Sequence, residues 1–423
     1  MFKIGFSQED QWTLPETTAV VLLVCSVVLV LTIEIAADRI GLQRPHEFLF
    51  SSIWVSAALL GAALAHFTKV DKRQEQIAVL GLGAIVVALF MAVRKMGLDP
   101  PFQNRIALLS YGMAIASCVV FVFMIVRKKR SLTSTIKIAA PAWLVVCSIL
   151  ISNTAINATA SMATYDNNLF LFEEGLGLRI AAMIHSVLEY GPSLVDVLLK
   201  YIYDLLPVMV ALHYGFDRSR RLSFPILFVV SAIVGSLLYV CFPAAGPAYS
   251  IENYYRTIVA APSSYLDVAS SNVPRNCMPS LHATWAYFFL WNSAHFKAPL
   301  RWMFRVFGIL TLVATFTAGG HWFIDLVVAV PFAAAIQAAC VSNLRWTNPK
   351  RSLIVAGCFA LAIAWLVLLQ NQHFFDGIPL SLRWLLILLS VSIPVVLVHS
   401  FILPQQTTNL GRCERMSFDC PVS

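Results

Sequence analysis

About twelve apolar runs, each near the roughly 20 residues that a helix needs to cross a bilayer, constrain this chain more than any other feature. They cover residues 17–37, 48–66, 77–94, 105–126, 136–156, 193–214, 223–243, 279–297, 300–318, 321–341, 353–370 and 383–404. The composition agrees, because 59% hydrophobic and 12% charged residues lie outside the range of a soluble domain. The sequence therefore predicts an all-α polytopic membrane protein with about 12 transmembrane helices.

Lysine and arginine gather at five places between these runs, and such residues accumulate on the cytoplasmic side of a membrane. The clusters are Lys69, Lys72 and Arg73; Arg127 to Arg130 with Lys137; Arg218, Arg220 and Arg221; Lys297, Arg301 and Arg305; and Arg345, Lys350 and Arg351. All five fall on one side if twelve helices alternate from a cytoplasmic N-terminus. Both termini are then predicted to be cytoplasmic.

The formal net charge of +8 is accounted for by these basic loops. No soluble segment interleaves basic and aromatic residues, so the charge does not indicate nucleic-acid binding. We predict an integral membrane protein, and the short loops favour a bacterial inner membrane over a Golgi membrane.

The stretch from Arg275 to Asp325 carries the residues most suited to chemistry. It opens Arg275-Asn276-Cys277-Met278-Pro279-Ser280-Leu281-His282 and closes Gly319-Gly320-His321-Trp322-Phe323-Ile324-Asp325. Two apolar runs separate these ends, so the chain crosses the bilayer and returns. His282 and His321 are therefore predicted to meet at one membrane face, which is extracytoplasmic in the orientation above.

The residues around the two histidines favour an anion. Pro279 suits the first turn of a helix, which places Ser280 and His282 beside free backbone N–H groups. Asp325 lies one helical turn after His321, where a carboxylate can accept a proton from one imidazole nitrogen and leave the other free to attack. This combination predicts a phosphoryl-transfer site.

Two of these segments resemble motifs of the type 2 phosphatidic acid phosphatase superfamily. Pro279-Ser280-Leu281-His282 is similar to its second motif, and the spacing of His321 and Asp325 is similar to its third. Leu281, where most phosphatases of the superfamily have glycine, and the proline-rich turn from Pro243 to Pro247 both resemble the inositol phosphorylceramide synthase-like branch. The resemblance is tight over 275–325 and looser over 136–341.

The chain lacks two cationic residues that the superfamily pattern contains. The serine-arginine pair expected before the third-motif histidine is Ala314 and Thr315 here, and Lys200 is followed by Pro207 without the arginine of the first motif. A dianionic monoester would need those cations. A phosphodiester carries one charge fewer and would need less.

The resemblance implies roles for the catalytic residues. His321 would be the nucleophile on phosphorus, and Asp325 would orient it. His282 would protonate the leaving oxygen and later act as base toward water or an alcohol. No metal or cofactor is required.

Ser280 and adjacent backbone amides, helped by Arg275 or Lys200, would hold the non-bridging oxygens. A metal site is the competing chemical interpretation. It would use His321, Asp325 and His282, and it needs a further ligand such as Asp267 or Glu252 from the outer loop.

The predicted function is a lipid phosphotransferase or phosphatase that uses a phosphohistidine intermediate, with headgroup transfer of the inositol phosphate type preferred. A polyprenyl or phosphatidate-type hydrolase is an alternative. Another is a non-enzymatic lipid or solute transporter, because Asp196, Lys200 and Asp204 form a charged stripe within the sixth run, and such charges usually face a wet cavity.

The domain organisation follows from these interpretations. We predict a four-helix region at 1–134, a six-helix phosphatase-type core at 135–345, two further helices at 346–404 and a cytoplasmic tail at 405–423. The long loop that ends at Met278 resembles a lid or headgroup-contact loop. Cys241 and Cys277 both approach the outer face, but one possible pair is no disulfide framework.

Overall fold

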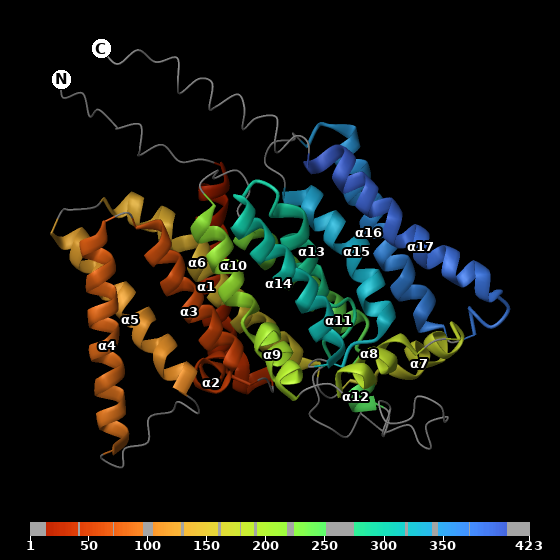
Figure 1. Ribbon diagram of the computed structural model, residues 1–423, viewed down its shortest axis with the longest axis horizontal. Helices are drawn as coiled ribbons and strands as arrows, with labels where there is room; N and C mark the ends of the chain where they lie inside the picture. The colour runs from red at the N-terminus through yellow and green to blue at the C-terminus, as the bar shows by residue number, and fades with distance from the viewer. Residues whose placement is uncertain are drawn as a thin grey trace. The chain divides into compact units, whose positions relative to one another are not determined.

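The computed structural model describes residues 14–40, 43–70, 72–95, 105–127, 131–159, 162–177, 179–189, 193–217, 224–250, 275–317, 320–340, 346–371 and 373–403. Within these ranges every regular element is a helix (Figure 1). This confirms the all-α prediction. The tail at 405–423, most of the proposed lid loop, and Glu252 and Asp267 lie outside the described residues.

Nine helices in the described part of the chain are long and apolar enough to cross a membrane. They coincide with nine of the predicted apolar runs. Their bounds are α1 (Leu14–Ile40), α4 (Arg73–Lys95), α5 (Arg105–Val126), α6 (Leu132–Ala158), α11 (Phe224–Cys241), α14 (Ala298–Thr317), α15 (Phe323–Cys340), α16 (Pro349–Gln370) and α17 (Leu380–Leu397), which continues as the π-helical turn η4 (Val398–Ile402). The protein is therefore an all-α polytopic membrane protein.

The other three runs form shorter helices. These are α3 (Ile53–Lys69), the pair α9 (Ser193–Asp204) and α10 (Leu206–Phe216), and α13 (Leu281–Asn292). The expectation of one continuous helix over 193–214 is wrong. Pro207 stands in the first turn of α10, where it has no N–H to offer Tyr203 four residues earlier, so the helix breaks.

Four further short helices connect these segments. They are α2 (Pro45–Ser51), α7 (Asp166–Glu174), α8 (Ile180–Glu189) and α12 (Pro247–Ser250). The chain divides into two compact units, residues 1–154 with 204–229 and residues 155–203 with 230–423. In the first unit α3 packs against α5 and α10, and α4 packs against α5. The domain borders predicted at 134 and 345 stay a prediction.

The second unit contains every candidate catalytic residue. Its centre is α15, which packs against α13, α16 and α17, while α13 also packs against α14 (Figure 1). Polar side chains fix the short α13 in place. The amides of Asn292 and Gln337 on α15 bond to each other in both directions at 2.9 Å, and Trp285 donates to Ser231 of α11 at 2.8 Å. Buried amides that satisfy each other avoid the cost of an unpaired polar group in an apolar interior.

Candidate active site

His282 lies in the first turn of α13, and Ser280 caps that helix. The Ser280 hydroxyl accepts a hydrogen bond from the Ala283 N–H at 3.2 Å. The expectation that Pro279 lies in the first turn is wrong, because serine is a strongly preferred cap and the helix begins directly after it. Ser280 and His282 are both buried.

His321 lies in the loop just before α15, and Asp325 lies in the first turn of that helix. The two side chains are buried, with 3.3 Å between Nδ1 of His321 and Oδ2 of Asp325. The same oxygen accepts the backbone N–H of Trp322 at 2.8 Å. Because an ionised carboxylate only accepts hydrogen bonds, we assign the imidazole proton to Nδ1, which leaves a lone pair on Nε2.

The two imidazole rings lie close to each other. Their centroids are 6.1 Å apart and their planes are inclined by 55°. Since His282 begins α13 and His321 follows α14, the ends of this helix pair that carry the histidines lie together. That arrangement requires α13 and α14 to run in opposite directions.

Cys277 is a third side chain at His321, and no sequence motif predicted it as a site residue. Its thiol donates to Oδ2 of Asp325 and lies 3.4 Å from Nδ1 of His321. Burial raises the pKa of the Cys277 thiol well above its usual range, and the Asp325 carboxylate raises it further. Cys277 and Cys241 are both free thiols.

Cys277, His321 and Asp325 are also the described residues that could hold a metal ion. Their ligand atoms lie within 4.8 Å of one another, and sulfur, nitrogen and oxygen donors of this kind bind zinc. The Asp325 oxygen, however, already accepts the thiol and the Trp322 N–H. The hydrogen bonds therefore explain this arrangement without a cation.

Asp166, the first residue of α7, links three parts of the site. Its carboxylate is fully buried and accepts the backbone N–H groups of Ala245 and Gly246 and the indole N–H of Trp322, each at 2.8 Å. Trp322 itself is fully buried. Asp166 thus connects α7 both to the proline-rich turn and to the residue after His321.

Glu173, two helical turns further along α7, holds the start of α15. Its carboxylate accepts the N–H groups of Phe323 and Ile324, the latter at 3.4 Å. These are backbone donors that a helix leaves without partners in its first turn. The seven-residue spacing of Asp166 and Glu173, which puts both on one helix face, is the signal by which they could have been found.

The proline-rich turn approaches the loop that carries His321 very closely. Gly246 and Gly320 both have positive φ, at 91° and 61°. A Cβ on Gly246 would overlap the carbonyl oxygen of Gly320. Only glycine permits this backbone contact.

The two candidate phosphate cations differ in their surroundings. Arg275 is fully buried, and its Nε donates to the Met162 carbonyl at 3.3 Å. Burial lowers the pKa of its guanidinium, while the Asp166 carboxylate acts in the opposite direction. Lys200 instead pairs with Asp196 at 2.9 Å and exposes 58% of its side chain.

Two aromatic rings pack against His282. The ring of Tyr203, on α9, stacks on the imidazole with 3.6 Å between centroids and 12° between planes. Trp285 meets the imidazole edge-on at 5.5 Å. Tyr203 was not predicted as a site residue, because only the charged residues of its run stand out in the sequence.

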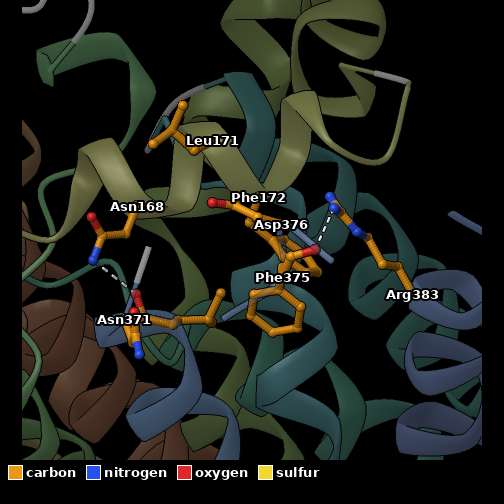
Figure 2. Close-up of a pocket in the computed structure, with 8 residues that line it drawn as sticks. Asn168, Leu171, Phe172, Asn371, Phe375, Asp376 and Arg383 are labelled. Atoms are coloured by element: carbon orange, nitrogen blue, oxygen red, sulfur yellow. Dashed lines mark hydrogen bonds between the residues drawn. The ribbon is translucent and has the colours of Figure 1, made fainter. Parts of the chain in front are cut away.

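A pocket lies on a different part of α7. Asn168, Leu171 and Phe172 line it from α7, facing the end of α16 and the start of α17, as Figure 2 shows. Asn168 donates to the carbonyls of Leu369 and Gln370 at 3.1 and 2.8 Å. None of the predicted site residues lines this pocket.

A comparison with known protein families matches the part of the chain that contains this site. A family model described as the PAP2 superfamily matches residues 167–339, a range that contains both histidines and Asp325. The match supports a phosphoesterase-type enzyme that acts on a lipid phosphate. No curated protein and no solved structure matches the chain. The inositol phosphorylceramide synthase-like branch stays a prediction.

Proposed function

We propose that this protein is a membrane lipid phosphotransferase that forms a phosphohistidine on His321, at the extracytoplasmic face of a bacterial inner membrane. The observation that carries the proposal is the placement of two buried imidazoles 6.1 Å apart, one of them 3.3 Å from a buried carboxylate. The match of this region to the PAP2 superfamily supports the same chemistry.

In the first half-reaction Nε2 of His321 attacks phosphorus and the bond from phosphorus to the leaving oxygen breaks. His282 gives its proton to that oxygen, so the lipid alcohol leaves neutral. Asp325 holds the Nδ1 proton and offsets the positive charge that develops on His321. The product is a phosphohistidine and a neutral His282.

In the second half-reaction an acceptor hydroxyl, from water or an alcohol, gives its proton to His282. The acceptor oxygen attacks phosphorus and the nitrogen–phosphorus bond breaks. His321 regains its lone pair and His282 regains its proton, so the enzyme returns to its starting state. Whether the outcome is hydrolysis or transfer depends on which acceptor occupies the site.

We favour a phosphodiester donor and transfer of an inositol phosphate-type headgroup. The position of the superfamily arginine is taken by Thr315, which is fully buried. Its hydroxyl donates to the Leu312 carbonyl at 2.6 Å, and its backbone carbonyl accepts the N–H of His321 at 3.2 Å. Lys200 is engaged by Asp196. Arg275 is then the candidate cation for the substrate, which suits a singly charged diester. A phosphatidate or polyprenyl phosphate hydrolase is the alternative within the same chemistry.

A transporter is the candidate from a different class, and it assigns function to the stripe of Asp196, Lys200 and Asp204. Lys200→Met separates the two proposals. The enzyme should keep most of its turnover, because an exposed ion pair contributes little, whereas a transporter that depends on this stripe should lose flux in proteoliposomes. Vanadate, which mimics pentacoordinate phosphorus, should inhibit only the enzyme.

Intact-protein mass spectrometry after incubation with candidate lipids tests the proposal directly. We expect a phosphoryl or headgroup-phosphoryl adduct on His321 that is absent in His321→Ala, with the adduct mass identifying the donor. Failure of every lipid phosphate to label or turn over, together with flux in proteoliposomes, would overturn the enzyme proposal.

A further inference from the structure

The general acid of the proposed reaction lies against an aromatic face that no motif describes. Tyr203 covers His282 in a nearly parallel stack at 3.6 Å, and Trp285 meets it from the side. The ring of Tyr203 therefore contacts the imidazole in a geometry that favours a positive charge on it.

Packing holds Tyr203 in this position. Leu199 and Ile202, its neighbours on α9, form a buried cluster with Ala314 of α14. Tyr203 packs against this cluster, and the helix ends one residue later at Asp204. Because α9 ends before Pro207, its last turn is the part of the helix that contacts His282.

The charge on His282 changes during the proposed cycle. It must carry a proton when the leaving group departs, and it must be neutral when the acceptor arrives. Among the described residues, Tyr203 and His321 face it, the buried Tyr239 lies near Tyr203 and the Leu281 backbone, and Asp325 and Cys277 lie behind His321. The stacked ring of Tyr203 is in direct contact with the imidazole, and an aromatic face stabilises a cation placed over it.

We propose that Tyr203 is a positioning residue that orients His282 and stabilises its protonated form while the leaving oxygen is protonated. This inference rests on the proposed function and deepens it. It predicts that Tyr203 matters for the first half-reaction when the leaving group needs a proton, and much less when it does not.

The test compares Tyr203→Phe, which keeps an aromatic face, with Tyr203→Leu, which removes it. Tyr201→Leu is the matched control, because Tyr201 lies on the same helix with its side chain exposed. Phosphoenzyme formation is measured by rapid quench with dioctanoyl phosphatidylinositol, whose diacylglycerol alkoxide needs a proton, and with the diester bis(p-nitrophenyl) phosphate, whose phenolate leaves without one.

We expect Tyr203→Leu to slow labelling by the lipid about 2- to 30-fold, the range of a cation–π contact, and to change labelling by the aryl ester less than about 2-fold. Tyr203→Phe and Tyr201→Leu should resemble the wild type. Equal losses with both donors, or a Tyr203→Phe variant as slow as Tyr203→Leu, would overturn the inference and leave the proposed function standing. A wild type that labels neither with these two donors nor with any other lipid phosphate overturns both.

Discussion

The imidazoles of His321 and His282 lie close together but have different surroundings. His321 has a carboxylate and a thiol at Nδ1, whereas His282 is packed between aromatic rings. A nucleophile benefits from a partner that fixes its tautomer, and an acid–base group benefits from surroundings that tolerate both of its charge states. The two environments therefore support the roles proposed for the two histidines.

This assignment predicts unequal losses on substitution. His321→Ala should abolish turnover and labelling, because the proposed phosphohistidine forms on that side chain. His282→Ala should lose about 10²- to 10⁴-fold, the usual contribution of general acid–base catalysis, and keep a trace. Steady-state turnover with a lipid phosphate measures both.

His373→Ala serves as the control, since this histidine is exposed and pairs with Asp376. Turnover by His321→Ala at or above the level of His282→Ala would contradict the assignment.

The Cys277 thiol leads to a prediction about pH. Burial and the Asp325 carboxylate raise its pKa, so the thiol keeps its proton at pH values where an ordinary cysteine begins to ionise. Alkylation by a maleimide should therefore remain slow between about pH 7 and 9, and increase only at higher pH.

Peptide mass spectrometry can follow each cysteine separately, and the exposed Cys241 provides the comparison. A thiol at 277 that reacts as fast as Cys241 at neutral pH would show that it is ionised or accessible, and that it does not act as a donor to Asp325.

At the scale of elements, α7 fixes the loop between Gly320 and Ile324 from two points. The Asp166 carboxylate accepts three hydrogen bonds, two of them from the proline-rich turn. The Glu173 carboxylate accepts backbone N–H groups at the start of α15. His321 lies in the loop between these attachments. The position of His321, the proposed nucleophile, thus depends on a helix that contributes none of the proposed catalytic groups.

Asp166→Asn should weaken this attachment. An amide can keep two of the three hydrogen bonds, but it turns an N–H₂ group toward a backbone N–H. A buried donor without an acceptor costs about 1–3 kcal/mol, so we expect a lower unfolding temperature and reduced turnover.

Thermal unfolding in detergent, with the exposed Asp376→Asn as control, measures the effect. An unchanged unfolding temperature and unchanged turnover would show that the site does not depend on this carboxylate.

Gly246→Ala tests the contact between the proline-rich turn and the His321 loop. The new Cβ would overlap the Gly320 carbonyl oxygen, and φ of 91° is unfavourable for alanine, so the backbone must move. We expect the free energy of unfolding to fall by more than about 1 kcal/mol. Turnover should fall by more than this loss of stability alone explains, because the displaced backbone leads to His321.

Gly357→Ala is the matched control. This glycine lies in α16, and a Cβ added to it would have no atom within 4 Å, so alanine should be neutral or stabilise the helix by up to about 1 kcal/mol. Equal behaviour of the two variants would contradict a close backbone contact at Gly246.

The sequence predicted elements of this fold better than its contacts. Apolar runs located the helices because a bilayer demands length and hydrophobicity, and the spacing of His321 and Asp325 indicated a pair within hydrogen-bonding reach. The break before Pro207 was missed because the apolar pattern continues through it. Tyr203 was missed because its partner lies more than 70 residues away along the chain, which no local pattern records. The spacing of Asp166 and Glu173 marks one helix face, but it does not say which distant donors that face contacts.

At the scale of the whole molecule, the number of crossings determines which side each loop faces. Nine helices of the described chain can cross on their own, whereas α13 has 12 residues and a length of about 18 Å, against a hydrocarbon core of about 30 Å. Yet His282 and His321 lie together. The segment that contains α13 must therefore span the same distance across the membrane as α14, which runs in the opposite direction. We therefore expect α13 to cross with its flanking turns, and α9 and α10 to cross together.

Reporter fusions after Arg127, Gly246 and Trp346 distinguish the two possibilities. Twelve crossings, with α3, the α9–α10 pair and α13 included, place 127 and 346 on one side and 246 on the other. Nine crossings place all three positions on the same side, whatever the orientation of the N-terminus. We expect the first result, with 127 and 346 cytoplasmic beside the basic clusters, because only that topology puts the proline-rich turn and the paired histidines on the face opposite to those clusters.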